Sequence, residues 1–294
     1  MNPAKTIFIV LTLFAAHISA VAQTEDVKKR WDEQIDTTRL NPFKPEYLQV
    51  ELDNVIEQFN KQPSFGMYHD NYFITGIPTN NQINKHTADA KFQISIRQRL
   101  FKNVLPFNSF LMLTYTQKSF WDIYEESSPF GDNNYNPGLL FAAPVIRHNK
   151  LRGVASLAFE HESNGKDGLD SRSWNYFTLS GVYFYNVYFW VQAKVWYGWL
   201  DGENPDLFKY KGYGLLALNY KSRNDRIGAS LVINPSKAAV NTQLELTFQP
   251  NKRANQYLFV QWYQGYDESL LEYNQYTSMI RFGICIRPPM RNLY

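Results

Sequence analysis

Strand-length segments of alternating apolar and polar residues recur along most of this 294-residue chain, with turn residues between them. Such a period of two predicts β-strands, whose successive side chains point to opposite faces of a sheet. We expect twelve strands, near residues 67–76, 88–100, 107–121, 135–147, 151–163, 173–185, 187–199, 209–221, 225–235, 240–250, 255–267 and 276–287. The sequence therefore predicts an all-β domain over residues 64–294.

These strands could build either a soluble sandwich or a barrel that spans a membrane. Aromatic residues make up 16% of the chain, with 20 Tyr and 21 Phe, which is typical of the aromatic girdles of membrane barrels. An even number of strands also suits a single-chain outer-membrane barrel, because both chain ends then lie on the periplasmic side. A twelve-stranded antiparallel transmembrane β-barrel is the predicted fold, and a soluble periplasmic sandwich is the less favoured alternative.

The N-terminal region has the features of an export signal. In residues 1–22, Lys5 precedes an apolar stretch from Ile7 to Ala16, and Ala20-Val21-Ala22 offers a small-x-small cleavage site. Residues 23–63 are charged and interrupted by proline, and we expect them to form a periplasmic N-terminal segment. An exported chain with no further apolar run of about 18 residues can reach the periplasm, the outer membrane or the outside, and the composition favours the outer membrane.

Net charge and cysteine content exclude other functions. The formal charge of +3 is small and no basic block is present, so nucleic acid is not an expected partner. The single cysteine, Cys285, excludes an internal disulfide, and its place in a late strand indicates a packing role.

The most informative stretch runs from His161 to Asn175. His161 and Ser163 are two residues apart on a predicted strand, so their side chains share one face with the apolar Phe159. Asn175 heads the apolar row of the next strand, which continues with Phe177. Three polar groups on an apolar face are costly unless they pair with each other. A histidine beside a serine can serve as base to a nucleophile, although this pattern alone is weak evidence for catalysis.

The stretch from His161 to Asn175 resembles the active-site signature of the outer membrane phospholipase A family, the calcium-dependent barrel lipases of Gram-negative bacteria. Three further stretches, in the same order along the chain, resemble that family over about residues 65–294. They are Tyr115–Ser119 with Trp121 and Glu125–Phe130, Asn204–Asp206 with Lys209–Tyr210, and Gly265–Leu270 with Tyr273–Asn274.

This resemblance implies a twelve-stranded barrel that hydrolyses the acyl esters of phospholipids in the outer leaflet. It implies both A1 and A2 activity, action on lysophospholipids, and an active form that is a calcium-loaded homodimer. Ser163 matches the family nucleophile, His161 the base and Asn175 the residue that orients the base. Gly165 falls where a backbone N–H helps to hold the oxyanion.

The resemblance also implies a calcium site. Its ligands are the carbonyl oxygen of Lys166 and the hydroxyl of Ser171, together with the carbonyl oxygen of Ser127 of the partner subunit. One departure from the family concerns a loop carboxylate that some relatives use for a second calcium arrangement. It aligns with Gly168 here, which puts that second arrangement in doubt.

Gln117 continues an outward row of the third predicted strand after Leu111, Leu113 and Tyr115. An unpaired amide in hydrocarbon costs a few kcal/mol, so a partner is expected. The family resemblance implies that this partner lies in the dimer interface. The alternative is a position shallow enough for Gln117 to meet lipid headgroups.

A non-enzymatic pore or structural barrel is the alternative function. Twelve strands enclose a narrow lumen, and Arg152, Glu160 and Glu162 are predicted to point into it, where charge pairs could fill it. We interpret Trp174 as a girdle residue and Arg172 as a residue that shapes the loop.

Overall fold

A computed structural model describes residues 60–101, 105–148, 150–200, 202–251 and 254–288. The chain divides into two units, residues 1–40 and residues 41–294, and all described residues belong to the second unit. The predicted signal peptide and most of the predicted segment 23–63 lie outside the described residues. No helix in the described part of the chain has the length and apolar character needed to cross a membrane.

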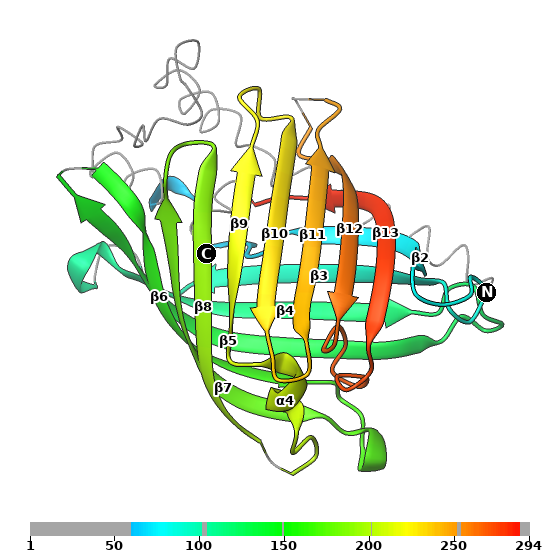
Figure 1. Ribbon diagram of the computed structural model, residues 1–294. Helices are drawn as coiled ribbons and strands as arrows, with labels where there is room; N and C mark the ends of the chain where they lie inside the picture. Colours follow the sequence, from blue (N-terminus) through cyan, green and yellow to red (C-terminus); the bar gives the residue numbers. More distant parts are fainter. Residues whose placement is uncertain (1–59, 102–104, 149, 201, 252–253, 289–294) are drawn as a thin grey trace. The chain divides into compact units, whose positions relative to one another are not determined.

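Antiparallel strands that follow one another in chain order make up a single sheet (Figure 1). The strands are β1 (Phe65–Met67), β2 (Asn71–Pro78), β3 (Asp89–Arg99), β4 (Phe110–Trp121), β5 (Phe130–Arg147), β6 (Lys150–Ser163), β7 (Ser173–Phe184), β8 (Phe189–Leu200), β9 (Gly214–Lys221), β10 (Ile227–Pro235), β11 (Val240–Phe248), β12 (Tyr257–Gly265) and β13 (Thr277–Ile286). Pairing of β13 with β2 closes the ring, so β2 to β13 form a twelve-stranded barrel and the predicted fold is confirmed.

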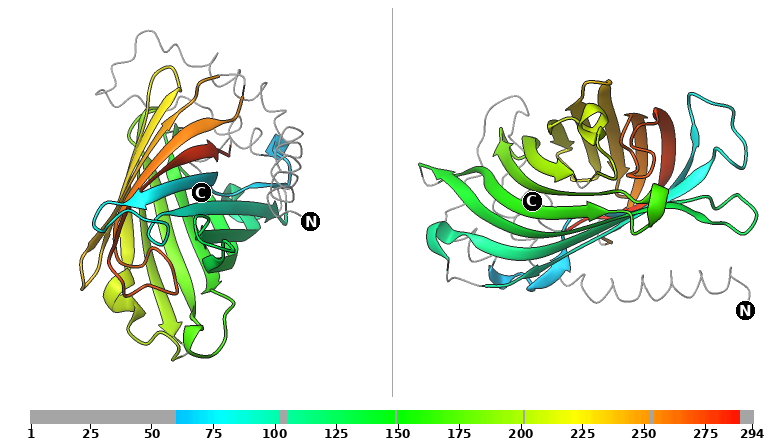
Figure 2. Two further views of the ribbon diagram at one scale, coloured as in Figure 1. Left: turned by 90° about the vertical axis from the view of Figure 1, so that its right-hand side faces the viewer. Right: turned by 90° about the horizontal axis from the view of Figure 1, so that it is seen from below.

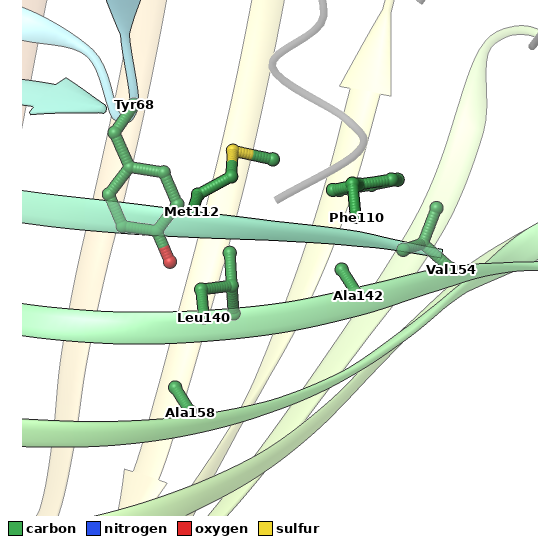
Figure 3. Packing of buried hydrophobic residues seen from close by; sticks show 7 residues of the cluster. All are labelled: Tyr68, Phe110, Met112, Leu140, Ala142, Val154 and Ala158. Carbon is green, nitrogen blue, oxygen red and sulfur yellow. The ribbon is translucent and has the colours of Figure 1, made fainter. Parts of the chain in front are cut away.

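The first barrel strand is interrupted. β1 and β2 both pair with β3, on the edge that β4 leaves open, so the predicted strand 67–76 corresponds to two pieces with a break at 68–70. Tyr68 in this break is buried in an apolar cluster inside the barrel, and Figure 3 shows its ring beside Met112 and Leu140. At this break the Tyr68 ring is buried, and the regular pairing with β3 is lost.

Most predicted strand limits are within a few residues of the observed ones, but two strands begin elsewhere. β5 begins at Phe130, five residues before the prediction, because the polar residues 131–134 are part of the strand. The predicted strand 209–221 begins at Gly214, because Leu207–Lys211 forms the short helix α4.

A β-bulge changes the direction of one predicted side chain. Val145 pairs with Gly153 and Ile146 with Leu151, so Arg152 is an extra residue on β6. The bulge reverses the alternation on one side of Arg152. Unbroken alternation from Phe159 would place Leu151 in the outward row, but Leu151 is 3% exposed.

The outer wall of the barrel is apolar beside the β6–β7 hairpin, whereas charged side chains face the lumen. Lys91 Nζ lies 3.0 Å from Glu268 Oε1, and an Arg281 guanidinium nitrogen lies 2.6 Å from the same oxygen. Arg281 also binds both carboxylate oxygens of Asp89, at 2.7 Å each. Glu268 belongs to the β12–β13 loop, so this loop turns into the barrel and bridges cations on β3 and β13.

We expect Glu268→Gln to lower the free energy of unfolding by about 3 kcal/mol at neutral pH, because two buried cations lose their shared anion. Burial raises the pKa of the Glu268 carboxyl, but Arg281 and Lys91 outweigh this effect and lower the pKa to about 2. The carboxylate therefore stabilises the fold above its ordinary pKa of 4.5, and this contribution is lost as the pH falls through about 2.

Denaturant unfolding of the barrel in vesicles between pH 7 and pH 2 measures this effect. Asp225→Asn is the matched control, because it removes the partly exposed Lys221–Asp225 pair and should cost less than about 1 kcal/mol. A difference between parent and Glu268→Gln that stays constant down to pH 2 would contradict the assignment.

An apolar cluster lies at one end of the barrel. α4 and the β12–β13 loop lie at this end (Figure 1), and the right-hand view of Figure 2 looks onto it. The buried members of the cluster are Trp174, Tyr176, Leu207, Leu270 and Tyr273. The interpretation of Trp174 as a girdle residue was wrong: its indole is 1% exposed, stacks on Tyr176 and donates to Glu162 Oε2 at 2.8 Å.

Candidate active site

His161 and Asn175 are direct partners across the β6–β7 hairpin. His161 Nδ1 lies 2.9 Å from Asn175 Oδ1. An amide oxygen only accepts hydrogen bonds, so Nδ1 carries the ring proton and Nε2 keeps its lone pair. The imidazole is thus held in the tautomer that can take a proton from a hydroxyl at Nε2.

Ser163 lies on the same side of β6 as His161, as the sequence predicts. The outward row of β6 contains Leu157 and Phe159, which are 49% and 42% exposed, and continues with His161 and Ser163. Ser163 pairs with Tyr135 of β5 and with Ser173 of β7. The structure therefore brings the predicted imidazole and amide into contact, and it places Ser163 two residues along the same outward row of β6. A contact between the Ser163 hydroxyl and the imidazole stays a prediction.

The loop after Ser163 is organised by Asn164, which is 3% exposed. Its Oδ1 accepts from the backbone N–H groups of Lys166 and Arg172 at 3.3 and 3.0 Å, and its Nδ2 donates to the Asp170 carbonyl at 2.8 Å. Arg172 donates to the Leu169 carbonyl at 2.8 Å, which confirms its role in loop structure. The Asn164-Gly165 pair is the sequence signal for such side-chain-to-backbone bonding.

Gly165 is required by the shape of this loop. Its φ is +67°, in the left-handed region, and a Cβ atom at this position would lie 2.9 Å from Tyr135 Cε2. Both the backbone conformation and the contact with the Tyr135 ring favour glycine. Gly165 lies two residues after Ser163, and its role in holding the oxyanion stays a prediction.

The predicted calcium ligands lie in two loops. Lys166 and Ser171 flank the short 3₁₀-helix η3 (Gly168–Asp170) in the β6–β7 loop, and Ser127 lies between β4 and β5 with a φ of +69°. Lys166 Nζ donates to the Gly131 carbonyl at 2.8 Å. No group of three or more His, Cys, Asp or Glu side chains in the described ranges could hold a metal. Carbonyl and hydroxyl oxygens would have to be the donors, and they fit a hard cation such as calcium.

Gln117 has partners within its own strand. Its Oε1 accepts from the Tyr115 hydroxyl and its Nε2 donates to Ser119 Oγ, each at 3.1 Å. Gln117 pairs with Tyr135, and Tyr135 pairs with Ser163, so Gln117 lies in the same cross-strand row as Ser163. The polar row thus extends over three neighbouring strands of the outer wall.

The Asn204–Asp206 motif anchors the start of β7. Asn204 Oδ1 accepts from the backbone N–H of Ser173 at 3.1 Å, and Ser173 Oγ donates to Glu203 Oε2 at 3.0 Å. Asp206 accepts from the Tyr273 hydroxyl. These contacts support the hairpin that carries the site, and they connect three of the stretches that carried the family resemblance.

Comparison with known proteins agrees with this geometry. Residues 25–286 match the family model for phospholipase A1. The phospholipase A1 of Escherichia coli is 34% identical over 211 residues, which cover 69% of this chain and 71% of that protein.

Solved structures give the same result. Outer membrane phospholipase A from Escherichia coli aligns with a TM-score of 0.70 and 27% identity over 79% of this chain and 97% of that chain. The Salmonella typhi outer membrane phospholipase dimer with bound calcium gives the same TM-score, identity and coverage. The chain therefore belongs to the phospholipase A1 family, whose β-barrel fold and outer-membrane phospholipase function it shares.

Proposed function

We propose that this chain is a calcium-dependent phospholipase with a Ser163–His161–Asn175 triad. The observation that carries the proposal is the 2.9 Å contact between His161 Nδ1 and Asn175 Oδ1 on the apolar outer wall. A base oriented there meets the esters of bilayer lipids without any need to extract the lipid into a lumen.

Ser163 Oγ is the nucleophile, and His161 Nε2 takes its proton as the hydroxyl attacks the ester carbonyl. His161 then gives this proton to the departing lysophospholipid or glycerol oxygen, and a water molecule repeats the sequence to release the fatty acid. Asn175 holds the ring without placing a net charge at a lipid boundary, although it stabilises imidazolium less than a carboxylate would.

The oxyanion forms beside the backbone N–H of Gly165. The carbonyl of Lys166, the hydroxyl of Ser171 and the carbonyl of Ser127 of the partner subunit are the proposed calcium ligands. Bound calcium would supply the positive charge that a neutral triad and one N–H donor lack. The Salmonella typhi outer membrane phospholipase dimer with bound calcium supports calcium as the cofactor.

The substrates are phospholipids and lysophospholipids of the outer leaflet. The three residues of the triad lie on the outer wall and are only half-buried, so a phospholipid can approach with either acyl ester of its glycerol. We therefore propose both A1 and A2 activity. Phospholipid misplaced in the outer leaflet is the proposed natural trigger, because substrate and active dimer meet there.

The active form is a homodimer with Gln117 in its interface. Gln117→Ala should reduce the crosslinked dimer several-fold in detergent with calcium, because the variant lacks the only amide of this outward row. Thr242→Ala is the control, since it truncates a polar residue on β11, on the far side of the ring of strands. Crosslinking that shows Gln117→Ala dimerising as well as the parent would count against this role.

The proposed layout of the chain has three parts. Residues 1–22 are a cleaved signal peptide, residues 23–63 a periplasmic N-terminal segment and residues 64–294 the barrel that carries the enzyme. N-terminal sequencing of the exported protein tests the first boundary, which should fall at Gln23.

Hydrolysis and conductance together separate the enzyme from the alternative pore. The Lys91–Glu268–Arg281 bridge and the buried Trp174 cluster occupy part of the barrel interior, which favours the enzyme. Purified protein in mixed micelles with calcium should release fatty acid, and in planar bilayers it should show no steady conductance. Conductance that survives Ser163→Ala, without any ester hydrolysis by the parent, would support the pore instead.

A further inference from the structure

Pro137 interrupts the β5–β6 ladder beside the proposed base. Tyr135 pairs with Ser163 and Gly138 with Glu160, and the same register places Pro137 opposite His161. Proline has no backbone N–H, so it cannot donate to the carbonyl oxygen of the residue opposite. A central strand next to the catalytic histidine thus lacks one of its ladder bonds.

The side chain of Asn136 replaces this bond from the lumen. Asn136 Nδ2 donates to the His161 carbonyl at 2.8 Å and to the Tyr176 hydroxyl at 2.9 Å. The two acceptors use both hydrogens of the amide nitrogen. The inward position of Asn136 follows from the alternation of β5, in which Asn134 and Leu140 on the same face are buried.

The bond has a consequence for the outer wall. Since the His161 carbonyl points toward β5, its pairing with Asn175 on the other side is of the non-hydrogen-bonded type, with Cα atoms about 4.5 Å apart. Such a pair brings the two side chains close, but β7 then provides no backbone bond to His161. The His161 carbonyl therefore has to find its hydrogen-bond donor on β5. Because Pro137 has no N–H, only a side chain of β5 is available to donate to it.

The second acceptor of Asn136 is itself held in place. Tyr176 stacks on Trp174 with ring centroids 3.6 Å apart and an interplanar angle of 8°. Trp174 is bound to Glu162, whose carboxylate lies 3.6 Å from Lys211 Nζ. Asn136 therefore links the peptide of His161 to a buried aromatic and charged network behind the barrel wall.

We propose that Asn136 is a positioning residue for His161, which supplies from the lumen the donor that Pro137 lacks and so fixes the imidazole on the outer wall. This inference rests on the proposed function, in which His161 is the base. Loss of the donor leaves a buried carbonyl unpaired and lets the peptide turn, which moves the imidazole away from both Asn175 and the hydroxyl.

A double-mutant cycle tests the proposal in the full-length protein. Asn136→Leu should lower kcat for micellar phospholipid roughly 10-fold and leave KM unchanged, because the lipid surface is not altered. In a chain that already carries Pro137→Ala, which restores a backbone N–H opposite His161, the same Asn136→Leu change should cost less than about 2-fold. Asn219→Leu is the matched control, because Asn219 on β9 also donates its side-chain amide to a backbone carbonyl and is buried.

Each outcome either supports or overturns the positioning role of Asn136. Rescue by Pro137→Ala, with Asn219→Leu close to the parent, supports the positioning role. An equal loss of kcat in both backgrounds, no loss at all, or an equal loss for Asn219→Leu overturns it, provided that unheated gel mobility shows a folded barrel. His161→Ala is measured alongside: if it stays active, the proposed triad fails, whereas an inactive His161→Ala with an unaffected Asn136→Leu refutes only the role of Asn136.

Discussion

Ser163→Ala is expected to lower kcat for phospholipid hydrolysis by at least roughly 1,000-fold, because the hydroxyl that forms the acyl-enzyme is removed. The measurement is fatty-acid release from mixed micelles at saturating calcium. Ser173→Ala is the matched control: Ser173 is the cross-strand neighbour of Ser163, and its hydroxyl is bound to Glu203. This control should lose at most a few-fold in kcat.

Variants of the other two residues of the proposed triad should lose activity to an extent set by the chemistry of each residue. His161→Ala should match the loss of Ser163→Ala, since residues that act as one unit give non-additive losses. Asn175→Ala should cost only about 10-fold, because it removes one neutral hydrogen bond to the imidazole. If Ser163→Ala retained more than a tenth of the parent activity, Ser163 would be excluded as the nucleophile.

The fold could be predicted from alternation because the outer wall of the barrel is consistently apolar. The rows that carry Phe159 and Phe177 have an apolar residue at every second position until the site begins. A period of two identifies both the strand and its outward face. The twelve strands and their antiparallel order follow from this pattern and the short turns between them.

The errors arose where the inside of the barrel is polar. Asp132 and Asn134 at the start of β5 have the composition of a loop, but they are buried and accept from the backbone N–H groups of Leu271 and Leu270. By composition alone, polar strand residues that face a charged lumen cannot be distinguished from polar loop residues. α4 had a usable signal, because Asn204-Pro205-Asp206 just before Leu207 is typical of a helix start.

From the sequence, the site could be predicted only within the β6–β7 hairpin. The spacing of His161 and Ser163 placed their side chains on one face, and Asn175 lay at the matching end of the return strand. The direct pairing of His161 with Asn175 depends on the register, which the loop length did not determine. Asn136 lies on another strand and acts through a backbone carbonyl, so no pattern within the His161–Asn175 stretch could indicate it.

Removal of calcium with EGTA is expected to lower the activity of the parent roughly 1,000-fold, which corresponds to several kcal/mol of lost transition-state stabilisation. The protein's own groups cannot replace this charge. Asn175 is neutral, Gly165 offers one backbone donor, and the Lys166 amine is bound to the Gly131 carbonyl at 2.8 Å. Activity should return when calcium is added again, and magnesium should restore little, since it demands a tighter octahedral geometry than loop carbonyls provide.

The ligand assignment has a separate test. Ser171→Ala should raise the calcium concentration for half-maximal activity about 10-fold and leave the rate at saturating calcium nearly unchanged, because it removes one of several oxygen ligands. The calcium-dependent rise in unfolding temperature should shift to higher calcium by the same factor, which gives a readout independent of catalysis. Full activity of the parent in EGTA would contradict the cofactor. Unchanged calcium dependence of Ser171→Ala would contradict only this ligand, and the Ser173→Ala control shows whether hydroxyl loss elsewhere in the same hairpin has any such effect.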